Sequence, residues 1–104
     1  MTIQEIKTLL VSVDPGVQRY DHDFTGDENY TVWQEIGRVG FFGDGEDLGT
    51  IRFRVDRFTT DEDDRIAPAL KATLEDRDDI AVAYQVEYEL ETGYIHHIYN
   101  CEAI

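Results

Sequence analysis

The last quarter of the chain restricts the fold more than any other stretch. Apolar side chains occupy every even position of this stretch up to Leu90, namely Ile80, Val82, Tyr84, Val86, Tyr88 and Leu90. Successive side chains of a β-strand point to opposite faces, so this period of two predicts a strand with one buried and one solvated face. A second β-rich run, Tyr94–Ile104, follows the turn-forming pair Thr92-Gly93. The sequence therefore predicts a β-hairpin.

The tight turn at Thr92-Gly93 also predicts the register of this hairpin. With those two residues as the loop, Tyr88 lies opposite His97 and Val86 lies opposite Tyr99. A shift of one residue would exchange the two faces, so the face assignment is the critical part of the prediction. The predicted core face comprises Tyr84, Val86, Tyr88, Leu90, Ile95, Tyr99 and Cys101.

A first helix is predicted near the start of the chain. Thr2 and Glu5 have the spacing of a capping box, in which each side chain accepts a hydrogen bond from the other residue's backbone N–H. The turn triplet Asp14-Pro15-Gly16 should end the helix. The apolar residues between these signals recur at helical spacing: Ile3, Ile6, Leu9, Leu10 and Val13.

A second helix is predicted from the apolar spacing of Ile66, Leu70 and Leu74. Pro68 lacks a backbone N–H and is tolerated only in a first turn, so the regular helix should begin at Arg65–Ala67. A capping box formed by Thr59 and Glu62 is predicted upstream, and the helix should end near Arg77-Asp78-Asp79.

Two further strands are predicted, at Tyr30–Ile36 and Thr50–Thr60, and Gln18–Glu28 is interpreted as a surface connection. Alternation in the second strand places Ile51, Phe53 and Val55 inward and Arg52, Arg54 and Asp56 outward. The predicted order is α-β-β-α-β-β in a single domain, residues 1–104. We expect an α+β fold with an approximately four-stranded, mainly antiparallel sheet and both helices on one face.

The segment Gly37–Gly49 is unusual because it combines five glycines with the acids Asp44, Glu46 and Asp47. It is either a loop or the two ends of a long hairpin arm. Phe41 and Phe42 lie within it, and two interpretations stay open for them. They contact a partner, or they fold back onto the core.

The balance of charge restricts the partners. The chain has 23 acidic and nine basic residues, a formal net charge of −14, so we expect no specific nucleic-acid binding. The acidity has three open interpretations: solubility, a surface that must not adhere to nucleic acid, or a surface that imitates nucleic acid. No apolar run approaches the ~20 residues of a membrane span, so no membrane partner is expected.

The sequence predicts no enzyme, no cofactor and no metal site. His96 and His97 are adjacent in a strand and point to opposite faces, so they cannot share an ion. The acids 61–64 lack the ligand order of a calcium loop and are better explained as helix-capping residues. Cys101 is the single cysteine, which excludes an internal disulfide. Nucleophile elbows, phosphate loops and dinucleotide fingerprints are missing from the sequence.

Three blocks carry a family resemblance. They are Tyr30-Thr31-Val32-Trp33-Gln34-Glu35, then Arg54-Val55-Asp56-Arg57-Phe58-Thr59, then Tyr88-Glu89-Leu90-Glu91-Thr92-Gly93-Tyr94-Ile95-His96. In this order and spacing the chain resembles the small tail-terminator and tail-completion proteins of long-tailed bacteriophages and prophages. The blocks cover the chain from Tyr30 to its last residue, and the first helix also fits. The acidity and the Gly37–Gly49 segment depart from that pattern.

The resemblance implies a non-enzymatic virion protein of the tail or neck, present in the host cytoplasm during assembly. It implies a ring of identical subunits, often hexameric, that caps the tail tube and contacts head-connector proteins. The candidate assembly interface consists of Trp33, Phe41, Phe42, Arg52 and Arg54. Arg52 and Arg54 would offer charge complementary to the acids Glu87 and Glu89, either within one sheet or across subunits.

Two other functions remain possible. An acidic protein of this size can act as a nucleic-acid mimic that inhibits a DNA-binding protein, and the partner recovered in a pull-down distinguishes this from a tail protein. A host-encoded domain that binds a small molecule between sheet and helices is the third interpretation.

Overall fold

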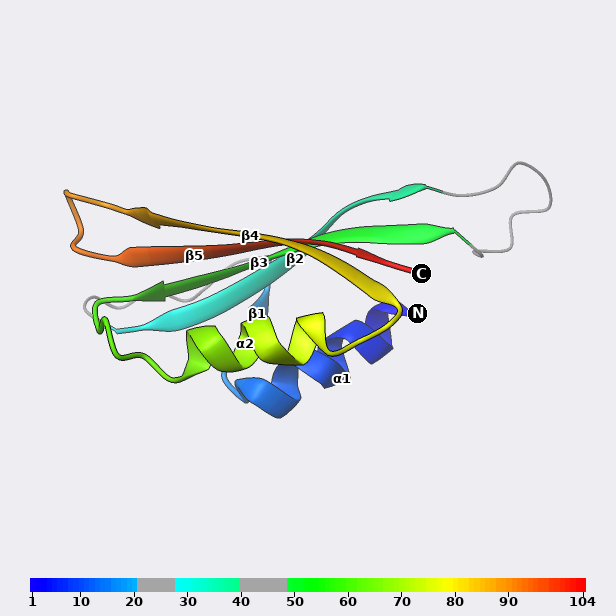
Figure 1. The fold of residues 1–104 in the computed structure, drawn as a ribbon, viewed down its shortest axis with the longest axis horizontal. Coiled ribbons are helices and arrows are strands. Elements are labelled where there is room, and N and C mark those ends of the chain that lie inside the picture. The colour runs from blue at the N-terminus through cyan, green and yellow to red at the C-terminus, as the bar shows by residue number, and fades with distance from the viewer. Residues whose placement is uncertain (21–27, 40–48) are drawn as a thin grey trace.

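The computed structural model describes residues 1–20, 28–39 and 49–104, and within them it has the predicted α+β fold (Figure 1). The elements are α1 (Ile3–Val13), β1 (Gln18–Arg19), β2 (Tyr30–Val39), β3 (Thr50–Thr59), α2 (Ile66–Glu75), β4 (Ile80–Tyr88) and β5 (Ile95–Ala103). The five-stranded sheet has the order β1-β2-β3-β5-β4. β1 runs parallel to β2, and every other neighbouring pair is antiparallel.

Both helices lie on one face of the sheet, as predicted (Figure 1). The opposite face is called the outer face below. The predicted order α-β-β-α-β-β gains one element, because β1 occupies part of the segment that was interpreted as a surface connection. This strand has only two residues, which pair with Val32 and Trp33.

Helix α1 begins and ends as the sequence predicts. The Thr2 hydroxyl accepts a hydrogen bond from the Glu5 backbone N–H at 3.1 Å, and the Glu5 carboxylate accepts one from the Thr2 N–H at 3.1 Å. The helix stops at Asp14, whose carboxylate accepts from the backbone N–H of Gly16 at 3.0 Å. The capping box and the turn triplet are both confirmed.

Helix α2 begins at Ile66 with Pro68 in its first turn, as predicted, but the second capping box is wrong. The Thr59 hydroxyl accepts from the Asp61 N–H at 3.1 Å, because Thr59 ends β3 well before the helix and closes the turn that follows. Asp64 instead supports the helix start, accepting from the Ala67 N–H at 2.9 Å. One of the four acids at 61–64 therefore supports the start of α2.

The core fills the layer between the sheet and the helices. Ile51, Phe53 and Val55 are buried on the helix side of β3, as their alternation predicts, and the Trp33 ring meets the edge of the Phe53 ring. The other buried members come from both helices and from β4 and β5: Ile6, Leu10, Leu70, Leu74, Ile80, Tyr99, Cys101 and Ala103.

One arginine lies inside this layer. Arg57 is 5% exposed, and its guanidinium makes a two-point contact with Asp64, with Nη2–Oδ1 at 2.9 Å and Nε–Oδ2 at 3.2 Å. Its Nη1 donates to the Thr31 hydroxyl at 3.3 Å and lies 3.8 Å from Asp14. The guanidinium thereby links the sheet to the ends of both helices.

The β4–β5 hairpin forms with a register different from the predicted one. Tyr88 pairs with Ile95 and Val86 with His97, a shift of two residues. Residues 89–94 make a wider turn, in which the Thr92 hydroxyl donates to the Glu89 carboxylate and accepts from the backbone N–H of residue 94. Because the shift is an even number of residues, every side chain keeps its predicted face.

The predicted core face of the hairpin is correct for β5 and wrong for the outer half of β4. Tyr99 and Cys101 are buried and Ile95 is half-buried. The exposed fractions are 37% for Tyr84, 52% for Val86 and 62% for Tyr88 in β4, and 87% for Leu90 in the turn that follows. The reason is length: ten helical residues span about 15 Å, whereas nine strand residues span about 30 Å, so α2 covers only one end of β4.

Candidate functional site

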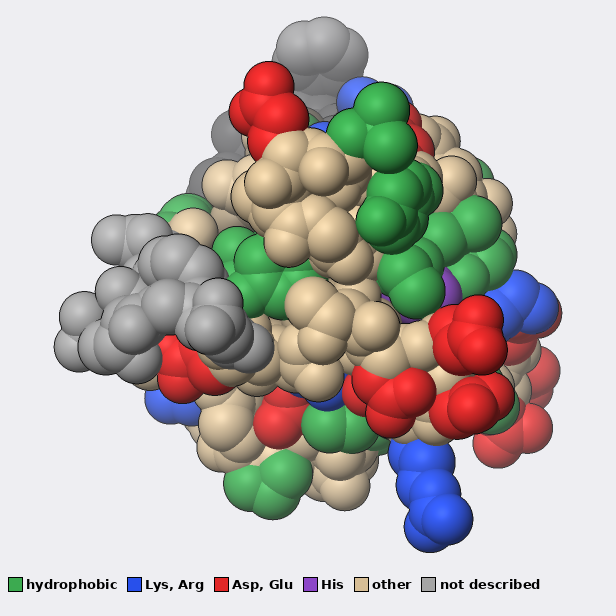
Figure 2. All heavy atoms as spheres, turned by 90° about the vertical axis from the view of Figure 1, so that its left-hand side faces the viewer, with side chains coloured by type: hydrophobic (Ala, Val, Ile, Leu, Met, Phe, Trp, Pro, Cys, Tyr) green, Lys and Arg blue, Asp and Glu red, His purple; other side chains and the backbone are tan. Residues whose placement is uncertain are grey.

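The exposed part of β4 is a candidate interaction surface. We call Tyr84, Val86, Tyr88 and Leu90 the apolar stripe. The stripe lies on the helix side of the sheet, toward the hairpin tip and past the end of α2 (Figure 1). Figure 2 views the molecule from this end and shows hydrophobic side chains gathered in a run beside acidic ones. An apolar run at the edge of a sheet is a favoured site for protein contact.

The first residue of the stripe is held in place by its neighbours. The Tyr84 hydroxyl lies 2.7 Å from Nδ1 of His97, and the Lys71 ammonium lies 5.6 Å from the centre of the Tyr84 ring. Burial lowers the pKa of His97. His97 is therefore a half-buried, hydrogen-bonded histidine on the helix side of the sheet, opposite in face to His96 as the alternation predicts.

The opposite edge of the sheet is also open over part of its length. β1 pairs with the edge of β2 at Val32 and Trp33. From Gln34 onward, no strand among the described residues pairs with β2 on the edge that faces away from β3. Arg19 lies on this edge, with its guanidinium 5.1 Å from the centre of the Trp33 ring and 3.5 Å from the Glu35 carboxylate. Within the described residues, each side of the sheet thus ends in a strand that has no further strand beside it over part of its length.

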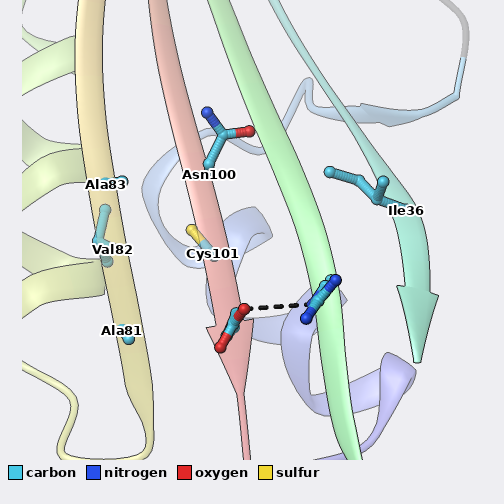
Figure 3. Close-up of a pocket in the computed structure, with 8 residues that line it drawn as sticks. Ile36, Ala81, Val82, Ala83, Asn100 and Cys101 are labelled. Atoms are coloured by element: carbon cyan, nitrogen blue, oxygen red, sulfur yellow. Dashed lines mark ion pairs between the residues drawn. The ribbon is translucent and has the colours of Figure 1, made fainter. Parts of the chain in front are cut away.

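The outer face has a shallow hollow of about 380 Å³ (Figure 3). Ala81 and Ala83 of β4 border it on one side and Ile36 of β2 on the other, with the Arg52–Glu102 ion pair at 3.2 Å between them. The small alanine side chains leave room at the β4 edge. Ile36 is 55% exposed at the β2 edge.

A polar cluster lies on the outer face near the hairpin tip. Asp56 was predicted to point outward; it does lie on that face, but it is only 6% exposed because it is packed against His96 and Arg54. His96 Nε2 lies 2.6 Å from Asp56, its Nδ1 lies 3.5 Å from Glu89, and Phe58 stacks on its ring. Since both ring nitrogens face carboxylates, the cluster orients the ring and joins the strands, and we assign it no catalytic role.

Two buried carboxylates have lowered pKa values. Burial alone would raise the pKa of Asp56, but hydrogen bonds from His96 and Arg54 outweigh burial and hold the pKa below its ordinary 3.8. Burial of Asp64 is outweighed in the same way by hydrogen bonds from Arg57 and from a backbone N–H, so its pKa is also lowered. Both acids are therefore more readily ionised in the folded chain than in the unfolded chain.

We expect this linkage to make the protein acid-sensitive. A lowered folded-state pKa adds stability that is present above about pH 5 and is lost as the pH falls below about 4. Urea unfolding measured between pH 7 and pH 3 should show a falling free energy of unfolding. Asp56→Asn combined with Asp64→Asn should flatten this dependence while lowering stability at pH 7. An equally steep pH dependence in the double variant would contradict the assignment.

The residues predicted for the assembly interface are separated in the structure. Trp33 is 1% exposed, so its side chain offers no surface to a partner, and we remove it from the candidate interface because it is needed in the core. Phe41 and Phe42 lie outside the described residues. Arg52 and Arg54 do lie on the outer face.

The two arginines make ion pairs within their own sheet. Arg52 pairs with Glu102 at 3.2 Å, and Arg54 pairs with Asp56 at 2.8 Å. Within one sheet, the predicted partners Glu87 and Glu89 are therefore wrong, because the two arginines pair with these other acids instead. Of the two, Arg52 is the more exposed, with 54% of its side chain accessible.

Clusters and spans typical of other site types were also sought. Within residues 1–20, 28–39 and 49–104, no group of three or more His, Cys, Asp or Glu side chains is arranged to hold a metal ion. No helix in the described part of the chain is long and apolar enough to cross a membrane. That the protein lacks metal and catalytic activity remains a prediction.

No protein-family model matches the chain, and no curated protein matches it. The functional argument therefore rests on the geometry of the two open edges and on the three sequence blocks. Sequence reasoning did not identify Ile36 or the alanines at 81 and 83 as surface features. Their position at the sheet edges depends on the strand order, which the sequence does not indicate.

Proposed function

We propose that the protein is a non-enzymatic virion subunit, a tail terminator or tail-completion protein that forms a ring at the tail–head junction of a phage or prophage. The observation that carries the proposal is the pair of open edges on opposite sides of one sheet, one of them bearing the apolar stripe. Two different surfaces that meet head to tail generate a ring when the rotation between subunits closes. The resemblance of the three blocks to tail-terminator proteins supports the same conclusion.

The acidity fits such a ring. DNA passes through the head–tail junction, and a lumen lined by carboxylates repels phosphates and keeps the DNA from adhering. The net charge of −14 supplies this repulsion in every subunit. Tail-tube and head-connector proteins are the proposed partners, and the virion neck is the proposed location.

The second candidate is the acidic mimic of nucleic acid. It is favoured by the stretch from Ile80 to Ile104, which has four glutamates and neither lysine nor arginine. A mimic needs regularly spaced charge, however, and the helix side of β4 carries the apolar stripe, while Glu87 lies on the outer face. In the small-molecule interpretation, the ligand binds between sheet and helices. In the described core, the side chains of Trp33, Phe53 and Tyr99 fill that space.

We expect the 12.0 kDa protomer to stay monomeric or weakly associated in dilute low-salt buffer and to assemble at higher salt or with magnesium. Repulsion between exposed charges weakens as the Debye length falls from ~10 Å at 0.1 M to ~3 Å at 1 M salt. Light scattering across a salt and magnesium series measures the mass. Sedimentation with purified tail tubes measures recruitment.

Calcium at the same concentration controls for general bridging of carboxylates, and bovine serum albumin controls for adhesion to the tubes. A protein that stays at the protomer mass throughout and is not recruited by tail tubes would defeat the ring proposal. The mimic would then be the leading candidate.

A further inference from the structure

We propose that the free edge of β4 pairs with the same edge of a second copy of the chain, antiparallel and about a two-fold axis at Val86. The inference goes beyond the proposed function, because a two-fold contact closes after two copies and does not build a ring. It covers the apolar stripe in the free protein instead. Three features of the described residues support it: the direction of the backbone groups, the pattern of exposed side chains, and the position of the acids.

The backbone groups at the free edge belong to the residues of the stripe. In the described part of the chain, no strand pairs with β4 on the edge away from β5. The Glu89 N–H donates to the Tyr94 carbonyl, and the Ile104 N–H donates to the Asp79 carbonyl, both at 2.9 Å. Because bonded and non-bonded residues alternate along an antiparallel ladder, the odd residues of β4 direct their backbone groups to β5. The even residues, which carry the stripe, direct theirs to the free edge.

Pairing about Val86 brings the exposed apolar side chains of two copies together on the helix side. In this register Val86 faces Val86 of the second copy, and Tyr84 faces Tyr88. Even residues meet even residues, so each facing pair exchanges two backbone hydrogen bonds. These side chains are all at least 37% exposed in the single chain. A register shifted by one residue toward the start of β4 would place Tyr88 opposite Val82, which already packs against the core. Such a shift would cover less of the stripe.

The acids of the hairpin exclude registers shifted toward the turn. About Val86, Glu87 faces Gln85 of the second copy, and Glu89 faces Ala83, so no two carboxylates lie directly opposite. A shift of one residue toward the turn would set Glu87 opposite Glu87, and a shift of two would set it opposite Glu89. Like charges directly opposite each other destabilise a pair of strands. The stretch from residue 80 to 104 has no lysine or arginine to offset them.

A lysine at each end of the contact adds attraction. The Lys71 ammonium lies 5.6 Å from the centre of the Tyr84 ring. Tyr88 of the second copy faces Tyr84 in the proposed register, so two aromatic rings would lie near each ammonium. A cation beside the face of an aromatic ring is attracted to it. This attraction offsets part of the repulsion between the acidic copies.

The area of the stripe indicates a weak dimer. A wholly covered aromatic side chain buries about 150–250 Å², so four side chains that are 37–87% exposed offer roughly 400 Å² per copy. A stable interface buries about 800 Å² per partner. The stripe supplies about half of this, and repulsion between the copies opposes pairing at low salt. The dimer can therefore open when the stripe is needed for assembly.

A single cysteine tests the contact and its register. In Val86→Cys the two new cysteines face each other across the axis, with Cα atoms about 5.5 Å apart, within the ~7 Å reach of a disulfide. Mild oxidation at high protein concentration should give a covalent dimer of twice the protomer mass on a non-reducing gel, and no larger species. The native chain should stay at the protomer mass, because Cys101 is buried and burial raises its pKa to about 12.

Tyr88→Cys is the matched control. Tyr88 belongs to the stripe, lies on the same face of the same strand and, like Val86, is more than half exposed. In the proposed register it faces Tyr84 of the second copy. The two copies of residue 88 are therefore separated by four residues along the strand, about 13 Å. Tyr88→Cys should give no covalent dimer, and both variants should keep the native circular dichroism spectrum.

Equal yields of dimer from Val86→Cys and Tyr88→Cys, or no dimer from Val86→Cys, would overturn the inference. The oxidised Val86→Cys dimer also separates the inference from the proposed function. It should keep its mass in the salt and magnesium buffer in which the native chain assembles, and a reductant should restore growth. Growth of the oxidised dimer would overturn its role as a cover for the stripe. Trapped dimers whose reduced form tail tubes do not recruit would support the two-fold contact and defeat the ring.

Discussion

Replacing Arg57 with methionine should lower the free energy of unfolding by about 3–5 kcal/mol, the usual cost of breaking a buried ion pair. Methionine keeps the length and apolar stem of the side chain but leaves the carboxylates of Asp64 and Asp14 without their cation. Asp64 has only 10% of its side chain exposed, so water cannot replace the lost contacts. Urea unfolding followed by tryptophan fluorescence measures the change, because Trp33 is buried in the same layer.

Two variants separate the burial of the charge from the loss of an arginine. Arg52→Met removes an ion pair whose partners are each 54% exposed, and exposed pairs contribute about 0–1 kcal/mol. Arg57→Met combined with Asp64→Asn should recover part of the stability, since the amide oxygen still accepts from the Ala67 N–H without an unpaired charge. Equal losses for Arg52→Met and Arg57→Met would contradict the buried-pair explanation.

Arg57 shows what a sequence pattern can predict and what it cannot. Alternation in β3 places odd positions inward, and Arg57 continues the series of Ile51, Phe53 and Val55. The pattern therefore indicates its face. It cannot indicate the partners. Asp14 lies at the end of α1 and Asp64 just before the start of α2, and these two helix ends meet only in the folded chain.

The parts of the fold that were predicted correctly depend on short-range signals. The capping box of α1, the start of α2 at a proline and the alternation of the strands each involve residues a few positions apart. The shifted hairpin register depends on side-chain hydrogen bonds inside the turn, which the pair Thr92-Gly93 does not indicate, and the strand β1 depends on a more distant part of the chain. The Thr92 hydroxyl stabilises a wider turn, and two residues become a strand only because β2 lies beside them.

The candidate site was harder to predict than the fold. The alternation from Ile80 to Leu90 indicates which side chains share a face, but not what covers that face. Comparing the predicted lengths of helix and strand would have shown that α2 is too short to cover β4. Trp33 failed as an interface residue for the opposite reason, since it is buried in the core cluster with residues of α1 and α2.

Changing Val86 and Tyr88 of the apolar stripe together to serine should abolish assembly without destabilising the protomer. Both side chains are more than half exposed in the single chain, so the fold loses little. In the assembly each apolar side chain contributes about 1–2 kcal/mol on burial. The two together contribute about 2–4 kcal/mol. Since 1.4 kcal/mol is tenfold in an equilibrium constant, the dissociation constant should rise by about thirtyfold to several hundredfold. Sedimentation in the assembly buffer measures it.

Gln85→Ser combined with Glu87→Ser is the matched control, because both residues lie on the other face of the same strand and carry no large apolar surface. Removing a glutamate reduces repulsion between copies, so this variant should assemble as well as the native chain or better. A loss of protomer stability in Val86→Ser/Tyr88→Ser would place the stripe in the core after all. Unchanged assembly with unchanged stability would show that the subunits meet at a surface other than the apolar stripe.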